Sequence, residues 1–301
     1  MKKNSFFYIV LFFGLFNFNY IFCQIKESKV LDGVYVKEHV KSRKPIPYHH
    51  LREADVMWGK KIWRMMDLRE KMNLPLYYPT TASKPFDDRF SLTELLLYGA
   101  EYEGLTVYSD IDDEFTTPIT IADVNKKLGA RVDTLQVEDP NTGQLVTKIV
   151  TQERKVEEVT RYLIKEYWFF DKQRAKLEVR IIGLCPLRVY VREATGTGGE
   201  LKEGESEEEK DLEIKQIMWV YFPAARPLFA NHEVFNPYND AERKTFDDIF
   251  FKRKFSSFIF KETNVYNNRE IWSYKVGLDA LLEAERIKDF IFKFEHDLWE
   301  Y

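Results

Sequence analysis

The spacing of apolar residues predicts amphipathic helices in the first half of the chain. Within residues 55–73 apolar side chains recur every three or four positions, which is typical of one helix face, and Asp55 can serve as the N-cap. That face comprises Trp58, Ile62, Met65, Met66 and Met72. A second helix is expected over residues 91–103, which open with a Ser-x-x-Glu capping box. A third is expected over residues 120–128, which are followed by glycine.

Two apolar stripes run along the last predicted helix, residues 278–299. One stripe follows steps of three and four and comprises Ala280, Ala284, Ile287, Ile291, Phe294 and Leu298. The opposite side carries Leu278, Leu281, Leu282, Phe292 and Trp299. A surface helix needs only one apolar stripe to pack on its own domain. The helix is therefore either buried on both sides, or one stripe serves a partner, and both interpretations stay open.

The region between the helices has the composition of β-strands. Alternating, β-branched and aromatic residues predict strands at 105–108, 134–138, 145–150, 159–170, 176–182, 187–192 and 214–222. Residues 159–170 are ambiguous between helix and strand, and their density of Thr, Tyr, Ile, Trp and Phe favours the strand. A short helix is expected near residues 246–251, because Asp247 and Asp248 suit its first turn. The order of elements lacks a strand–helix–strand rhythm, so we expect an α+β fold with an antiparallel sheet and helices packed on one side.

Two segments outside these elements have distinctive compositions. Residues 24–54 predict an extended arm, because Pro45 and Pro47 restrict the backbone and disfavour helix before them. Residues 194–213 are rich in Gly and Glu and have few apolar groups, which predicts a mobile surface loop. Because that loop joins two predicted strands, residues 55–301 are interpreted as a single domain.

The N-terminus predicts export. Lys2 and Lys3 precede an apolar run at residues 6–16, which is the pattern of a signal peptide spanning residues 1–23. A membrane anchor is the alternative, although the run is shorter than the roughly 20 residues that a spanning helix needs. Lipidation of Cys23 also stays open, but the preceding Phe is larger than lipoprotein signals favour. After cleavage one cysteine remains, so an internal disulfide is excluded in the exported form.

The sequence offers no recognisable catalytic, metal or cofactor motif. Its five histidines form no zinc-ligand spacing, and no paired cysteines accompany them. Glycines at positions 196, 198 and 199 lack the Lys-Ser/Thr of a phosphate loop and precede an acidic run. We therefore expect no metal, no cofactor and no enzymatic activity. A hydrolase or glycan-binding site assembled only in three dimensions remains the alternative.

Charge and aromatic content indicate a protein that binds other proteins. The net charge is −4 and no strongly basic cluster is evident, which argues against nucleic acid as the partner. The chain holds 17 Tyr, 24 Phe and 6 Trp, and aromatic and Arg side chains dominate protein–protein contacts. The candidate interface residues are Trp63, Arg64, Arg269, Trp272, Phe292 and Trp299.

Three long strings of this sequence resemble one family. Residues 55–79 read DVMWGKKIWRMMDLREKMNLPLYYP, residues 165–185 read KEYWFFDKQRAKLEVRIIGLC, and residues 245–301 combine an aromatic run with the last helix. These strings resemble the GldN/PorN family of the type IX secretion and gliding-motility machinery. The resemblance covers roughly residues 32–192 and 215–301, whereas residues 194–213 carry no part of it.

The resemblance implies a structural role. A GldN-like subunit is expected in the periplasm, peripherally associated with the outer membrane, where it assembles with the lipoprotein GldK (PorK) and with further copies of itself into a ring. Contact with the periplasmic part of the GldL–GldM motor is also implied. Such a protein transmits motor motion to secretion and gliding without catalysing a reaction. The rival function is that of a periplasmic hydrolase or glycan-binding protein.

Overall fold

A computed structural model describes residues 42–80, 89–111, 113–138, 145–191 and 212–298 of the chain, and within 132–150 only the backbone is described. The predicted leader, most of the arm, the greater part of the predicted acidic loop and Trp299 lie outside these residues. Residues 42–52 belong to neither a helix nor a strand.

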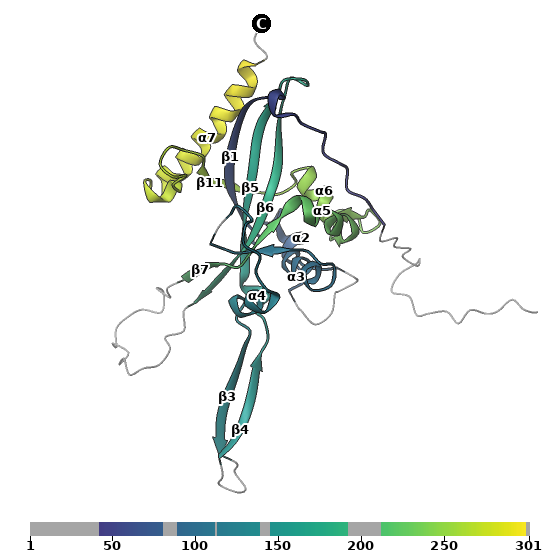
Figure 1. Cartoon of the computed structure of the whole chain (residues 1–301), viewed down its shortest axis with the longest axis vertical. Coiled ribbons are helices and arrows are strands. Elements are labelled where there is room, and N and C mark those ends of the chain that lie inside the picture. Colours follow the sequence, from purple (N-terminus) through teal and green to yellow (C-terminus); the bar gives the residue numbers. More distant parts are fainter. Residues whose placement is uncertain (1–41, 81–88, 112, 139–144, 192–211, 299–301) are drawn as a thin grey trace, which may run out of the picture. The chain divides into compact units, whose positions relative to one another are not determined.

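The centre of the protein is a seven-stranded antiparallel sheet in the order β11-β1-β5-β6-β8-β2, with β7 also paired to β6 (Figure 1). Its strands are β1 (Val56–Asp67), β2 (Val107–Tyr108), β5 (Val159–Asp171), β6 (Lys176–Val191), β7 (Leu212–Gln216), β8 (Trp219–Tyr221) and β11 (Phe258–Glu262). Every strand pair is antiparallel. The α+β fold with an antiparallel sheet is therefore confirmed.

The predicted helix over residues 55–73 is wrong. Residues Val56–Asp67 form strand β1, which pairs with β5 on one side and with β11 on the other. Ile62 and Met66 point to one face of the sheet, and Trp63 and Met65 point to the opposite face, because side chains alternate along a strand. A strand buried on both faces carries a dense apolar run, and such a run can resemble a broad helix face in sequence.

Six α-helices are described around this sheet. They are α2 (Leu74–Tyr77), α3 (Leu92–Tyr102), α4 (Ile121–Lys127), α5 (Phe222–Asn231), α6 (Phe246–Phe251) and α7 (Leu278–Asp297). The predicted helices at 91–103, 120–128, 246–251 and 278–299 are confirmed within a few residues. At the start of α3, Ser91 Oγ accepts a hydrogen bond of 3.3 Å from the backbone N–H of Glu94. The described residues also form three short 3₁₀ turns, η2 (Glu53–Asp55), η3 (Val156–Glu158) and η4 (Ile271–Ser273).

The remaining strand predictions are largely correct, with two differences. The hairpin β3 (Arg131–Glu138) and β4 (Leu145–Gln152) forms as expected and pairs with no other described strand. Strand β6 is a single element where two strands were predicted. The strand predicted over 214–222 divides into β7 and β8 and then enters helix α5, which was missed. Pro227 lies inside α5, and proline is unfavourable in a helix interior. The sequence therefore did not predict this helix. A further small pair joins β9 (Glu233–Val234) to β10 (Lys244–Thr245).

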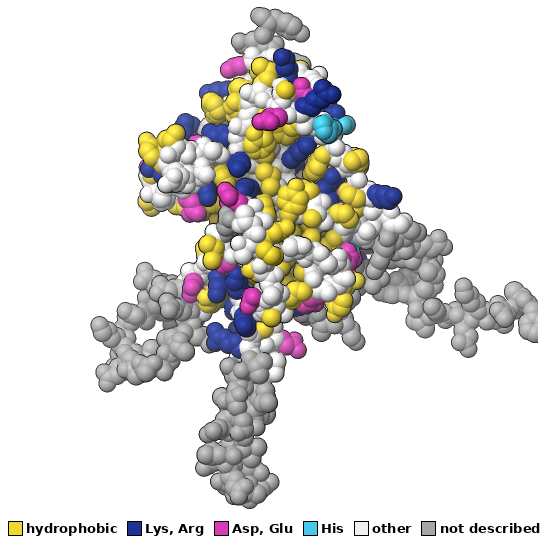
Figure 2. All heavy atoms as spheres, viewed as in Figure 1, with side chains coloured by type: hydrophobic (Ala, Val, Ile, Leu, Met, Phe, Trp, Pro, Cys, Tyr) yellow, Lys and Arg dark blue, Asp and Glu magenta, His cyan; other side chains and the backbone are white. Residues whose placement is uncertain are grey.

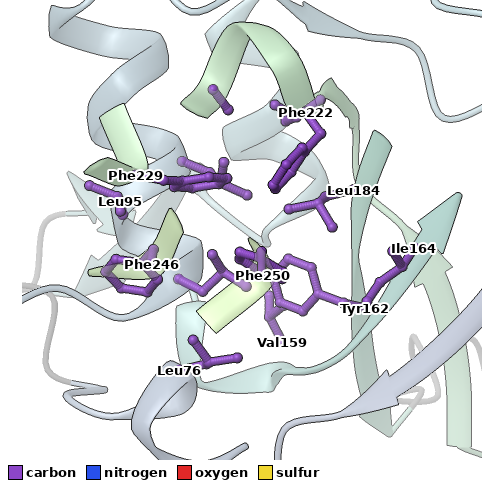
Figure 3. Close-up of a cluster of buried hydrophobic side chains, with 14 of the residues drawn as sticks. Leu76, Leu95, Val159, Tyr162, Ile164, Leu184, Phe222, Phe229, Phe246 and Phe250 are labelled. Carbon is purple, nitrogen blue, oxygen red and sulfur yellow. The ribbon is translucent and has the colours of Figure 1, made fainter. Parts of the chain in front are cut away.

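The main hydrophobic core lies between the sheet and the helices α3, α5 and α6, and Figure 3 shows many of its side chains. Four phenylalanines from α5 and α6 form its centre, with ring centroids 5.4 to 6.1 Å apart. They are Phe222, Phe229, Phe246 and Phe250. Met66 of β1 and Ile164 of β5 belong to the same cluster. This core packs helices α3, α5 and α6 against the sheet.

Two smaller clusters complete the packing of β1. On the face that carries Ile62, helix α7 packs against β1 and β11 through Ala284, Ile287 and Ile291. On the opposite face a second cluster is built around Trp63. Its members are Trp63, Met65, Leu163, Cys185, Leu187, Trp219 and Phe260. Helix α7 therefore covers the same face of β1 as the main core, near the other end of the strand.

Candidate protein interface

Helix α7 uses one of its two apolar stripes to attach to the sheet. Ala284, Ile287 and Ile291 are buried. Farther along the same stripe, the ring of Phe294 stacks on that of Trp58 with centroids 4.6 Å apart. These contacts hold the helix on β1 within its own domain.

The opposite stripe of α7 is exposed. Leu278 and Phe292 have 70% and 66% of their surface accessible, and Leu281 and Leu282 are also exposed. Figure 2 shows apolar side chains gathered at the place where Figure 1 draws the first turns of α7. Of the two stripes, the described part of the chain buries only one.

A turn before α7 presents further aromatic residues. Asn264 organises it: its side-chain Oδ1 accepts from Tyr266 N at 3.0 Å, and its backbone N–H donates to Asn268 Oδ1 at 3.1 Å. Asn267 and Asn268 both have a φ of 55°, which asparagine tolerates better than most residues. Five consecutive residues are thus held in a defined conformation by their own side chains.

Arg269 is the most distinctive residue of this turn. Its guanidinium lies over the ring of Tyr266 at 4.4 Å and over that of Tyr274 at 4.3 Å. The side chain is exposed, so the stacked rings orient its donors without removing them from solvent. Stacked arginines of this kind lose less freedom when they bind, because the planar group is already positioned.

Trp272 extends the same surface. It is 44% exposed and lies against Phe258 and Phe260, each with ring centroids 6.0 Å from its own. We call the exposed residues of this region the C-terminal surface. It comprises Val265, Tyr266, Arg269, Trp272, Val276, Leu278, Leu281, Leu282 and Phe292. Sequence reasoning named three of them as interface candidates. The Asn264–Asn268 turn was the signal that could have added Tyr266.

Of the other two candidates that the structure describes, Trp63 is buried and Arg64 is half-buried. Trp63 is only 3% exposed, and its indole Nε1 donates to Asp113 Oδ2 at 2.6 Å. Arg64 donates from Nε and Nη2 to Ser257, with both distances 2.8 Å. Burial lowers the pKa of the Arg64 guanidinium below its usual range. Both residues lie on strand β1 and hold the sheet together, so they offer a partner little surface. The last candidate, Trp299, lies outside the described residues.

Two buried side chains, Cys185 and Tyr162, have pKa values raised by their surroundings. Cys185 is buried, and desolvation raises the pKa of its thiol. Burial likewise raises the pKa of Tyr162, whose hydroxyl lies 2.6 Å from that of Thr93. Among the described residues, His, Cys, Asp and Glu form no group of three that could hold a metal ion. Within the same residues, none of the helices combines the length and apolar character needed to cross a membrane.

The described residues thus combine an α+β fold with an exposed, largely apolar C-terminal surface. A comparison with family models finds a match to "Gliding motility associated protein GldN" over residues 51–300. The chain therefore belongs to the GldN family, whose members are components of the gliding-motility and type IX secretion machinery. The matched region includes the whole C-terminal surface. No curated protein matches the chain significantly.

Proposed function

We propose that this protein is a structural subunit of the periplasmic ring of the type IX secretion machinery. Its residues 1–23 direct export, and the mature chain associates peripherally with the outer membrane. There it assembles with a GldK-like (PorK-like) lipoprotein and with further copies of itself, and it contacts the periplasmic part of a GldM-like motor protein. It acts by transmitting force through its interfaces and catalyses no reaction.

The observation that carries this proposal is the division of α7 into two stripes within a chain of the GldN family. One stripe attaches the helix to the sheet, and the other exposes leucines and a phenylalanine to solvent. Exposed apolar side chains that lie together are typical of a surface that binds a protein. Arg269 and Trp272 beside it are the residue types that dominate binding energy at such surfaces.

The experiment is recovery of partners from cross-linked cell envelopes. The Leu281→Asp/Phe292→Asp double variant places two carboxylates on the exposed stripe without touching the stripe that packs on β1. We expect it to recover far less of a GldK-like or GldM-like protein than the unmodified chain does. Ile111→Asp is the matched control, because Ile111 is highly exposed and lies outside the C-terminal surface.

Two results would count against the proposal. If the unmodified chain recovers neither protein, membership of a ring complex is contradicted. The alternative result is that the double variant recovers the same amount of both partners as Ile111→Asp. In that case the ring assignment stands, but the C-terminal surface does not bind these partners. Circular dichroism and urea unfolding establish that both variants remain folded.

A further inference from the structure

The described end of the N-terminal arm docks on the body of the protein through one tyrosine. The guanidinium of Arg226 lies 4.4 Å from the centre of the Tyr48 ring, and that of Arg180 lies 5.1 Å from it. Arg180 Nη2 also donates to the backbone oxygen of the next residue, His49, at 2.8 Å. A ring contacted by two guanidinium groups gains cation–π attraction from each of them.

The groove that receives Tyr48 is built without the arm. Arg226 is fixed by a buried, bidentate ion pair with Asp247, at 2.8 and 3.1 Å. Arg180 lies over the ring of Phe169 at 5.2 Å, on the sheet. These supports come from α5, α6, β5 and β6. A receptor whose charged groups are already positioned costs little to organise when a ligand binds.

The described part of the arm adds no buried residue and no strand to the body. None of residues 42–50 is buried, and none pairs with a strand. Figure 1 shows this segment running from the start of β1 toward the side that carries α5 and α6. Pro45 and Pro47 restrict the backbone around Ile46, so the segment before Tyr48 resembles a short, stiff peptide ligand.

The arm does not fill the groove in which it lies. A cavity of about 260 Å³ remains between the arm and the body. Its lining includes Ile46, Pro47, Val179, Ile181, Phe250 and Phe251. Ile46 is nevertheless 62% exposed. Residues 49–55 connect Tyr48 to Val56, the first residue of β1.

We propose that this groove is a receptor for residues 45–49 of a second copy of the chain, so that neighbouring subunits exchange arms. Every copy carries both the groove and the segment 45–49 that lies in it. The groove of one copy can therefore make the same contacts with the segment 45–49 of another copy. Such exchange is a low-cost route to association, and a contact made in one direction from subunit to subunit generates a ring when the rotation closes. This inference rests on the proposed self-assembly and names the element responsible.

The test uses single-cysteine variants of the full chain in a Cys23→Ser background. Ile46→Cys on one tagged copy and Phe251→Cys on a differently tagged copy are co-expressed and treated with a short bismaleimide. Both positions line the same cavity, whereas the native Cys185 is buried. Arm exchange predicts a cross-linked heterodimer. Adding Tyr48→Ala to the Ile46→Cys copy should reduce that product roughly tenfold, through loss of both cation–π contacts.

Two controls make the outcome decisive. Tyr238→Cys replaces Phe251→Cys as an exposed position outside the cavity lining, and it should yield little heterodimer. The Ile46→Cys/Phe251→Cys double variant reports docking within one chain. Cross-linking confined to single chains, in a protein that light scattering finds oligomeric, would overturn arm exchange and leave the ring proposal standing. A heterodimer that forms equally well with Tyr48→Ala would also overturn it, because contact would not depend on the arginine pair.

Discussion

Trp63 Nε1 donates a hydrogen bond of 2.6 Å to Asp113 Oδ2, joining strand β1 to the segment that follows β2. The same carboxylate lies 3.2 Å from Lys165 Nζ, whose side chain is buried on β5. The lysine also lies over the Trp63 ring at 5.7 Å. One acidic side chain therefore satisfies two groups on the face of the sheet opposite α7.

The first prediction concerns that carboxylate. Asp113→Ala leaves the Lys165 charge and the Trp63 N–H without their side-chain partner, although Lys165 keeps its bond to the Asp113 backbone oxygen. We expect a loss of roughly 2–4 kcal/mol in the free energy of unfolding, measured in urea. Asp297→Ala removes an exposed carboxylate and should change stability little. Equal stabilities of the two variants would contradict a structural role for Asp113.

The second prediction concerns Gly183, which lies beneath the ring of Phe115. A Cβ atom at Gly183 would lie 2.4 Å from Phe115 Cζ, too close for either atom to remain in place. Gly183→Ala should therefore destabilise the protein by about 1–3 kcal/mol. In the Gly183→Ala/Phe115→Ala double variant the clash is absent, so its loss should be smaller than the sum of the two single losses. If the losses of unfolding free energy, measured in urea, are additive, contact with Phe115 is not the reason why alanine is unfavourable at position 183.

The third prediction separates the two stripes of α7. Ile287→Ala removes a buried side chain from the contact with the sheet and should cost roughly 2–4 kcal/mol of unfolding free energy. Leu281→Ala truncates an exposed side chain and should change stability by less than about 0.5 kcal/mol. Thermal and urea unfolding of both variants check the contrast. Comparable losses would mean that the outer stripe is also buried by the chain itself.

The fourth prediction is a pH dependence from Glu94 in the first turn of α3. Burial raises the pKa of this carboxyl, only partly opposed by the charge of Arg154. The folded state therefore binds the proton more tightly than the unfolded state does. Stability falls as pH rises from the unfolded pKa through the folded pKa, and the full penalty persists above that window.

Glu94→Gln removes this titration. Relative to the unmodified protein, the variant should gain stability as the pH rises through that window, and it should hold a constant advantage above it. Urea unfolding at a series of pH values from mildly acidic to neutral measures the difference. Glu285→Gln, at an exposed position of α7, is the matched control. A difference between Glu94→Gln and the parent that does not change with pH would contradict the raised pKa.

Local patterns predicted several elements because their determinants are close in sequence. The Ser91 cap and the regular spacing in α7 each depend on residues a few positions apart. The same locality explains the misassignment of β1. Its two apolar faces are covered by segments distant in the chain, namely α7 on one side and the residues around Asp113 on the other.

The candidate interface residues also divide into those whose position the sequence predicted and those whose position depends on distant contacts. Arg269, Trp272 and Phe292 were proposed from residue type, and the structure places all three on the exposed C-terminal surface. Trp63 and Arg64 were proposed on the same grounds, but the structure places them on a central strand. Residue type identifies side chains that can bind strongly. Only the packing around each one decides whether it meets solvent or the core.

Patterns in the residue order were enough to predict the α+β class, the position of most helices and strands, the two stripes of the last helix and the resemblance to the GldN family. These properties reside in short-range periodicity, turn chemistry and long characteristic strings. The tertiary structure alone decided that β1 is a strand, that Trp63 lies inside, which stripe of α7 faces outward, and that Tyr48 lies against two arginines. Each of these outcomes depends on contacts between residues far apart in the chain, whose free energies outweigh local preferences.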